Sequence, residues 1–88
     1  MEVKFSKPFE KDFKTIQDRK VILKIDDIIT SLANTSSLVS IENLKKIKGH
    51  KNCYRIRIGD YRLGLLVSGK EIWLARILHR REIYRYFP

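Results

Sequence analysis

Two arginines alternate with apolar residues in the segment Cys53–Ile58, and their spacing is typical of a β-strand with one charged face. With a period of two, the tyrosine and the two isoleucines of this segment face one side of a sheet, and Arg55 and Arg57 face the other. The first side is expected to join the core. The second side is cationic, and the neighbouring sequence adds Lys45, Lys46, Lys48 and Arg62.

An arginine-rich sheet face has two interpretations. Antiparallel sheets commonly leave one side in water, so these charges can form a solvated surface without a ligand. A guanidinium, however, presents five donors in a planar fork that suits bidentate contacts with phosphate, and few acids are present here to neutralise it. We therefore expect a polyanion site, with nucleic acid as the leading ligand. An acidic protein segment and a membrane surface are the rivals, and the membrane is the weaker because both expected helices carry mixed charge.

The segment Leu78–Phe87 brings a second set of chemically useful groups to the end of the last expected strand. It contains an imidazole, three guanidiniums and two phenols, namely His79, Arg80, Arg81, Arg85, Tyr84 and Tyr86. In metal-free cleavage of a phosphodiester, arginines stabilise charge in the transition state and a histidine or tyrosine transfers protons. Each group also has a simpler explanation, since a lone histidine is more often structural and a tyrosine can pack its ring and leave its hydroxyl wet.

Metal and cofactor chemistry lack their usual sequence signals. Cys53 is the single cysteine, with no CxxC pair and no His-x-x-x-His spacing, so neither a disulfide nor a zinc site is expected. A Gly-rich phosphate loop, HExxH, GxSxG and a carboxylate cluster able to hold magnesium are also absent. We expect any catalysis to be independent of metal and of cofactors.

The periodicity of the apolar residues predicts the elements that position these groups. Residues 3–5 alternate and precede Pro8, which suits a strand followed by a helix that Ser6 can cap. Two helical stripes follow, the first over Phe9, Phe13 and Ile16, and the second over Val21, Ile25, Ile28 and Leu32. Beyond residue 44 the period becomes alternating, and turn signals separate strands at about 44–48, 54–58, 61–67 and 71–78. Residues 82–87 form either a helical turn or an extended tail.

The composition limits the size and the class of the protein. With 88 residues, 43% of them hydrophobic, the chain is expected to fold as one domain over residues 1–88. It carries a net charge of +9, and all of this excess lies after residue 44, because the seven acids before that point balance six lysines and one arginine. No apolar run is long enough for a signal peptide or a membrane span, so we expect a cytoplasmic protein. The fold class is α+β, with two N-terminal helices packed on a small twisted antiparallel sheet.

The order of these motifs resembles the RelE/ParE toxin superfamily over nearly the whole chain, and most closely the RelE-type toxins of toxin–antitoxin pairs. The resemblance is carried by Phe5, the segment 9–13, Lys48-Gly49, the segments 53–58 and 59–63, and His79-Arg80-Arg81-Glu82-Ile83-Tyr84. It implies the α+β fold expected above. It also implies cleavage of messenger RNA in the ribosomal A site, through attack of the 2′-hydroxyl on the adjacent phosphate, and neutralisation by a cognate antitoxin that wraps around the toxin.

The resemblance assigns roles residue by residue. Lys48 matches a basic residue ahead of the second strand of the meander, and Arg62 matches the arginine that stabilises the phosphate. Arg80 is similar to the second catalytic arginine, with Arg81 as the alternative register, and Tyr84 is similar to the C-terminal tyrosine, with Tyr86 as its alternative.

Arg55 and Arg57 depart from the family pattern, because they stand where RelE carries lysines, one of which transfers a proton. Arginine cannot lose its proton in ordinary circumstances, so another group must act as the base. We expect His79 to take or share that role. Two other functions remain open: a ParE-like toxin that poisons DNA gyrase without nuclease activity, and a non-toxic chain that only binds antitoxin.

Overall fold

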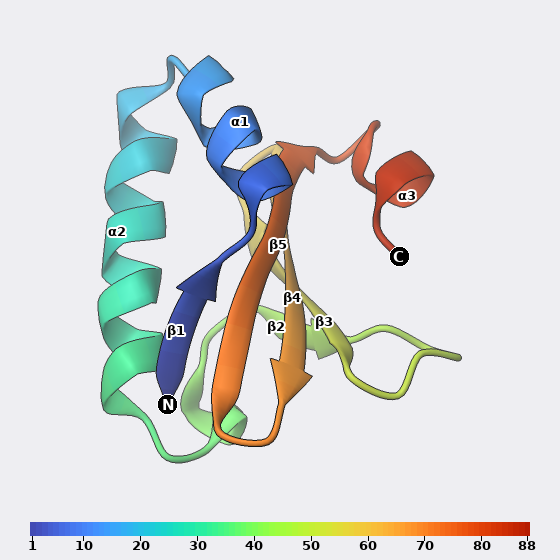
Figure 1. Ribbon diagram of the computed structural model, residues 1–88. Coiled ribbons are helices and arrows are strands. Elements are labelled where there is room, and N and C mark those ends of the chain that lie inside the picture. Colours follow the sequence, from blue (N-terminus) through green and yellow to red (C-terminus); the bar gives the residue numbers. More distant parts are fainter.

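The computed structural model describes residues 1–88 and contains a five-stranded sheet with α1 and α2 on one face and α3 on the other (Figure 1). The elements follow in the order β1 (Glu2–Phe5), α1 (Lys7–Thr15), α2 (Arg19–Asn34), the 3-10 turn η1 (Leu38–Ser40), β2 (Leu44–Lys46), β3 (Cys53–Ile58), β4 (Tyr61–Ser68), β5 (Glu71–His79) and α3 (Ile83–Tyr86). The strand order in the sheet is β1-β5-β4-β3-β2. The expected α+β fold class is confirmed, with both N-terminal helices packed on one face.

The sheet differs from the expectation in one pairing. Strands β2 to β5 form the expected antiparallel meander, but β1 pairs with β5 in parallel, with Glu2 opposite Glu71 and Phe5 opposite Leu74. The expected antiparallel pairing therefore holds for β2 to β5 but not at the edge formed by β1. The two helices carry the chain across one face from β1 to β2 at the far edge of the sheet, and the antiparallel meander of β2 to β5 then returns it to β1, where β5 runs in the same direction as β1.

The start of α1 is fixed by a single serine. Ser6 accepts a hydrogen bond from the Phe9 backbone N–H at 3.1 Å, as the cap prediction required, and Pro8 occupies the first turn, where a missing N–H costs nothing. The Ser6 hydroxyl also donates to the Ala75 carbonyl at 2.8 Å. The cap of α1 is thus attached directly to β5.

Helix α2 is held by its apolar stripe. The four predicted stripe residues of α2 are all buried, and they pack against the inner face of the sheet together with Ile56, Leu63 and Leu74. Burying each such aliphatic side chain contributes about 1.5–3 kcal/mol, which exceeds what helix propensity alone supplies. None of the three helices is long and apolar enough to cross a membrane.

The outer face of the sheet is only partly open. Cys53 and Ala75 lie on this face and form a second, smaller cluster with Ile83 of α3 and with Phe87. The sequence predicted a cationic outer face for this sheet, and the structure shows that α3 covers part of it and leaves the rest to the arginines of β3 and β4.

Candidate phosphate-binding site

The arginines predicted on β3 converge with residues of both neighbouring strands on the outer face of the sheet. The register places Arg55 opposite Lys45 of β2 and Arg57 opposite Arg62 of β4. Cross-strand partners point to the same face of a sheet, so these four cations share one surface. They line a depression of about 250 Å³ together with Asn43 and Tyr84.

Tyr84 is brought to this depression by α3. Its ring centroid lies 5.2 Å from the Arg55 guanidinium carbon, and its hydroxyl accepts a hydrogen bond from Arg55 Nη1. The side chain remains largely exposed, at 63%. A ring held by a cation on one side and open to solvent on the other can stack on an unpaired nucleobase.

Arg62 is held by the turn between β3 and β4. Its Nη1 donates to the carbonyls of Gly59 and Tyr61, each at 2.9 Å. Gly59 has a φ of +56°, a left-handed conformation that glycine adopts without a steric penalty. These two bonds use one nitrogen of the guanidinium, and its remaining N–H donors are left for an anionic ligand.

A wider groove of about 820 Å³ continues from this depression toward α2, and Arg57 and Arg62 line both. His79 and Arg80 line the groove but not the depression. Arg80 is placed by its backbone N–H, which donates to the Asp60 carbonyl at 2.7 Å. Its Nε lies 4.0 Å from the Asp60 carboxylate, and because both side chains are exposed this ion pair holds the guanidinium only weakly.

His79 has a defined hydrogen-bonding state. Its Nδ1 accepts the Arg81 backbone N–H at 3.2 Å, and its ring meets Tyr61 edge-on with centroids 5.9 Å apart. A neutral imidazole whose Nδ1 accepts a hydrogen bond carries its proton on Nε2. His79 can therefore accept a proton at Nε2 only after it gives up the bond from Arg81 and changes tautomer.

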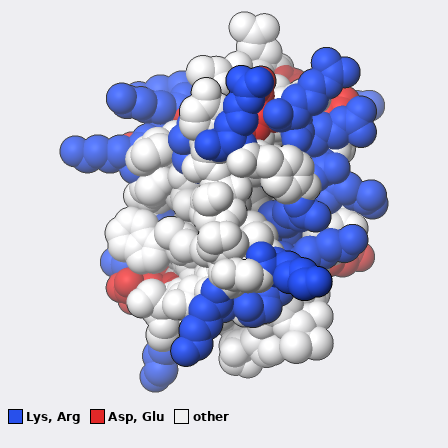
Figure 2. All heavy atoms as spheres, turned by 90° about the vertical axis from the view of Figure 1, so that its right-hand side faces the viewer, with Lys and Arg blue, Asp and Glu red and all other residues white.

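The molecule carries little negative charge on this side. Figure 2 faces the side that bears α3 and the β2–β3 loop, and it shows lysine and arginine side chains around a central uncharged strip, with few acidic ones between them. No three His, Cys, Asp or Glu side chains gather closely enough to hold a metal ion. The arrangement can bind and orient a polyanion through side chains alone.

Comparison with known proteins identifies the family of the chain. A family model described as the ParE toxin of the type II toxin–antitoxin system parDE matches residues 3–84. The chain belongs to the RelE/ParE toxin superfamily. The toxin RelE3 of Methanocaldococcus jannaschii is 45% identical over 89 residues, which cover 100% of both chains.

Solved structures share the fold of this chain. The RelB–RelE antitoxin–toxin complex from Methanococcus jannaschii contains a chain that is 44% identical, with 97% of this chain and 99% of that chain covered and a TM-score of 0.84. The YoeB dimer from Staphylococcus aureus matches at 25% identity and a TM-score of 0.71, with 86% of this chain and 92% of that chain covered.

Several of the expected site residues line neither the depression nor the groove. Lys46, the last residue of β2, donates to the carbonyl of His50 in the β2–β3 loop at 3.1 Å. Lys48 is exposed on this loop, which projects from the body in Figure 1. Arg81 is exposed in the turn after β5. Tyr86 lies over the Arg76 guanidinium, with 5.1 Å between the guanidinium carbon and the ring centroid. Of the two candidate tyrosines, Tyr84 is the one that lines the depression with Arg55 and Arg62.

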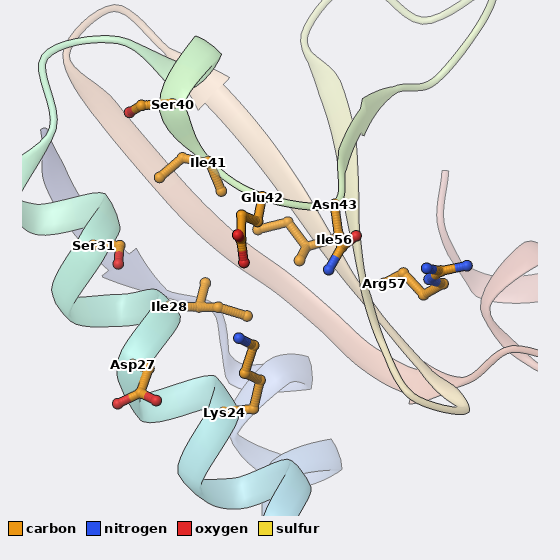
Figure 3. A pocket seen from close by; sticks show the side chains of 10 residues that line it. All are labelled: Lys24, Asp27, Ile28, Ser31, Ser40, Ile41, Glu42, Asn43, Ile56 and Arg57. Carbon is orange, nitrogen blue, oxygen red and sulfur yellow. The ribbon is translucent and has the colours of Figure 1, made fainter.

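Asn43 is a site residue that sequence reasoning missed. It lines the depression, the groove and a third pocket of about 310 Å³ between α2 and residues 40–43 (Figure 3). Its φ is +60°, and its carbonyl accepts the Arg57 backbone N–H at 3.3 Å. Asparagine tolerates this left-handed conformation better than most residues, which is the only signal that the sequence carries for it.

Proposed function

We propose that this family member is a metal-independent endoribonuclease that cleaves messenger RNA in the ribosomal A site. The observation that carries the proposal is the convergence of Arg55, Arg57, Arg62 and Tyr84 in one depression that no carboxylate lines. Guanidiniums there can bind the scissile phosphate and stabilise the additional negative charge of the transition state. Acting on ribosomes, the protein would work in the cytoplasm.

The reaction requires two proton transfers. The 2′-hydroxyl loses its proton and its oxygen attacks the adjacent phosphorus, the bond from phosphorus to the 5′-oxygen of the next nucleotide breaks, and that oxygen gains a proton from water. The arginines cannot accept the proton of the 2′-hydroxyl, since they remain protonated. We assign the proton-accepting role to His79, on the groove that continues from the depression, and assign phosphate contacts to Arg62 and Arg80. Tyr84 orients the nucleotide by stacking.

Induction of the protein in cells without an antitoxin tests this function. Primer extension on a reporter transcript should reveal cuts phased with the codons. Arg62→Ala should abolish them while remaining folded, and Lys70→Ala, which removes a cation from the turn at the far end of β4, should not. Cuts that persist at full rate in Arg62→Ala would contradict the assigned site.

A second candidate function is supported by the family model, whose description names the ParE toxin. A ParE-like protein of this fold would poison DNA gyrase and leave messages intact. The same induction separates the two, because growth arrest with DNA damage and uncut transcripts favours gyrase. Normal growth with uncut transcripts favours a non-toxic chain that only binds antitoxin.

We also propose a cognate antitoxin as the protein partner, as in the RelB–RelE complex that resembles this chain. A segment that combines acidic and apolar residues would suit a surface with this many arginines and lysines. Affinity for such a partner should fall as salt concentration rises, because exposed charges are screened. An affinity that does not change with salt would contradict a mainly electrostatic interface.

A further inference from the structure

Three residues form one row across the outer face of the sheet. Gly64 of β4 is opposite Arg55 of β3 on one side and opposite Arg76 of β5 on the other. The three aromatic residues of the C-terminal segment lie on this row. Tyr84 lies over Arg55, Tyr86 lies over Arg76, and the Phe87 ring comes so close to Gly64 that a Cβ there would lie 2.4 Å from it.

Helix α3 depends on this row for its position. It has four residues and no side-chain cap, and a helix of one turn is not stable by itself. Residues two positions apart project from a helix about 200° apart. Tyr84 and Tyr86 therefore extend to opposite flanks of α3, where each meets an arginine, and Ile83 is buried between them.

Arg76 is the better fixed of the two arginines. Its Nε and Nη2 donate to the Asp12 carboxylate at 2.7 and 3.0 Å, and the Ile77 backbone N–H donates to the same carboxylate at 3.1 Å. Asp12 is buried, and its hydrogen bond raises the pKa of Arg76 above the ordinary value. The guanidinium is thus a rigid, charged platform that connects α1 to the last strand.

A β-bulge in β5 sets the direction of the Arg76 side chain. Leu65 is opposite Leu74 and Gly64 is opposite Arg76, so Ala75 is an extra residue between them. Ala75 packs with Ile83 and Phe87 on the outer face. The bulge thereby supports α3 with one residue and directs the next, Arg76, toward Asp12.

We propose that Arg76, fixed by Asp12 and acting through the ring of Tyr86, is a positioning residue that sets the place of Tyr84 beside Arg55. The inference rests on the ribonuclease function proposed above and adds Arg76, which lies outside the proposed RNA-binding site. Arg76 lines neither the depression nor the groove, so it makes no contact with RNA there. Tyr86 is 55% exposed, and its ring therefore contributes little as a core residue.

The test compares Tyr86→Ala with Tyr86→Phe, each in the native chain and in a Tyr84→Ala background. Single-turnover cleavage on programmed ribosomes should fall about 10- to 100-fold in Tyr86→Ala, because a small displacement of a positioning group has an effect of that size. Tyr86→Phe keeps a ring over Arg76 and should recover most of the loss. In the Tyr84→Ala background, Tyr86→Ala should cause no further loss. Equal losses in both backgrounds, or a Tyr86→Phe variant as impaired as Tyr86→Ala, would overturn the proposal.

A second measurement keeps the inference separate from the function. The NMR signal of the Arg55 side-chain N–H groups reports the ring of Tyr84, and amide exchange at Phe87 reports the hydrogen bond to the Ile83 carbonyl at 2.8 Å. Tyr86→Ala should shift the NMR signal of the Arg55 side chain and accelerate amide exchange at Phe87, even if the native chain cleaves no RNA. An unchanged Arg55 signal in Tyr86→Ala would overturn the positioning role whether or not the ribonuclease function stands.

Discussion

Arg57 and Arg62 are directly opposite each other on β3 and β4, with no acid paired to either. Like charges in opposite positions of an antiparallel pair destabilise a sheet. The Arg62 guanidinium donates hydrogen bonds to the carbonyls of Gly59 and Tyr61 and to no carboxylate. Proteins retain arrangements that reduce stability mainly where function requires them, so this pair supports a ligand that supplies the missing negative charge.

Replacement of Arg57 by threonine should therefore separate stability from function. Arg57→Thr removes the repulsion and introduces a residue that favours strands, so the free energy of unfolding should rise by about 0.2–1 kcal/mol. RNA cleavage should fall by about tenfold or more, because a charged contact with phosphate is lost. Urea denaturation and cleavage on programmed ribosomes measure the two effects. Lys70→Thr is the control for net charge, and equal stabilisation in that variant would show that the cross-strand pair is not the cause.

Gly64 should be intolerant of even a methyl group. In Gly64→Ala the new Cβ would lie 2.4 Å from Phe87 Cδ2, so the ring and α3 must move. Overpacking of this kind costs about 1–3 kcal/mol of unfolding free energy, measurable by thermal or urea denaturation. In a Phe87→Ala background the same substitution should cost almost nothing. A penalty of equal size in both backgrounds would place the strain in the strand itself rather than in the contact with Phe87.

The parts of the fold that follow from local periodicity were predictable. Helix α2 carries four apolar residues at helical spacing, and all four are buried: Val21, Ile25, Ile28 and Leu32. A stripe of this kind lies on one side of the helix, so only that side can pack on the sheet. The parallel pairing of β1 has no such local signal. It depends on the chain crossing to β2 at the far edge of the sheet and returning through three antiparallel pairs to β5, an arrangement that the residues of β1 alone do not encode.

The site was predictable only where it lies on regular strands. Alternation placed Arg55 and Arg57 on one face, and the turn at Gly59 placed Arg62 beside them. The choice between Tyr84 and Tyr86 was beyond the sequence, since a four-residue helix is too short for a period, and its orientation depends on contacts with β3, β4 and β5. The pair of Asp12 and Arg76 joins residues 64 positions apart, and no local pattern connects them.

His79 offers the sharpest test of the proposed chemistry. If its ring accepts the proton of the 2′-hydroxyl, a side chain that cannot exchange a proton should slow the cleavage step itself. His79→Asn keeps an acceptor near the position of Nδ1 for the Arg81 N–H but cannot exchange a proton. Its rate of single-turnover cleavage on programmed ribosomes should drop about 10²- to 10⁴-fold.

His79→Ala provides the comparison that separates the two roles of the ring. It loses both the proton acceptor and the bond from Arg81, which is 3.2 Å long in the native chain. If proton transfer is the main contribution, the asparagine and alanine variants should be about equally slow. An asparagine variant that cleaves at the native rate would show that His79 only orders the turn before α3, because its single remaining task would then be to accept the Arg81 N–H.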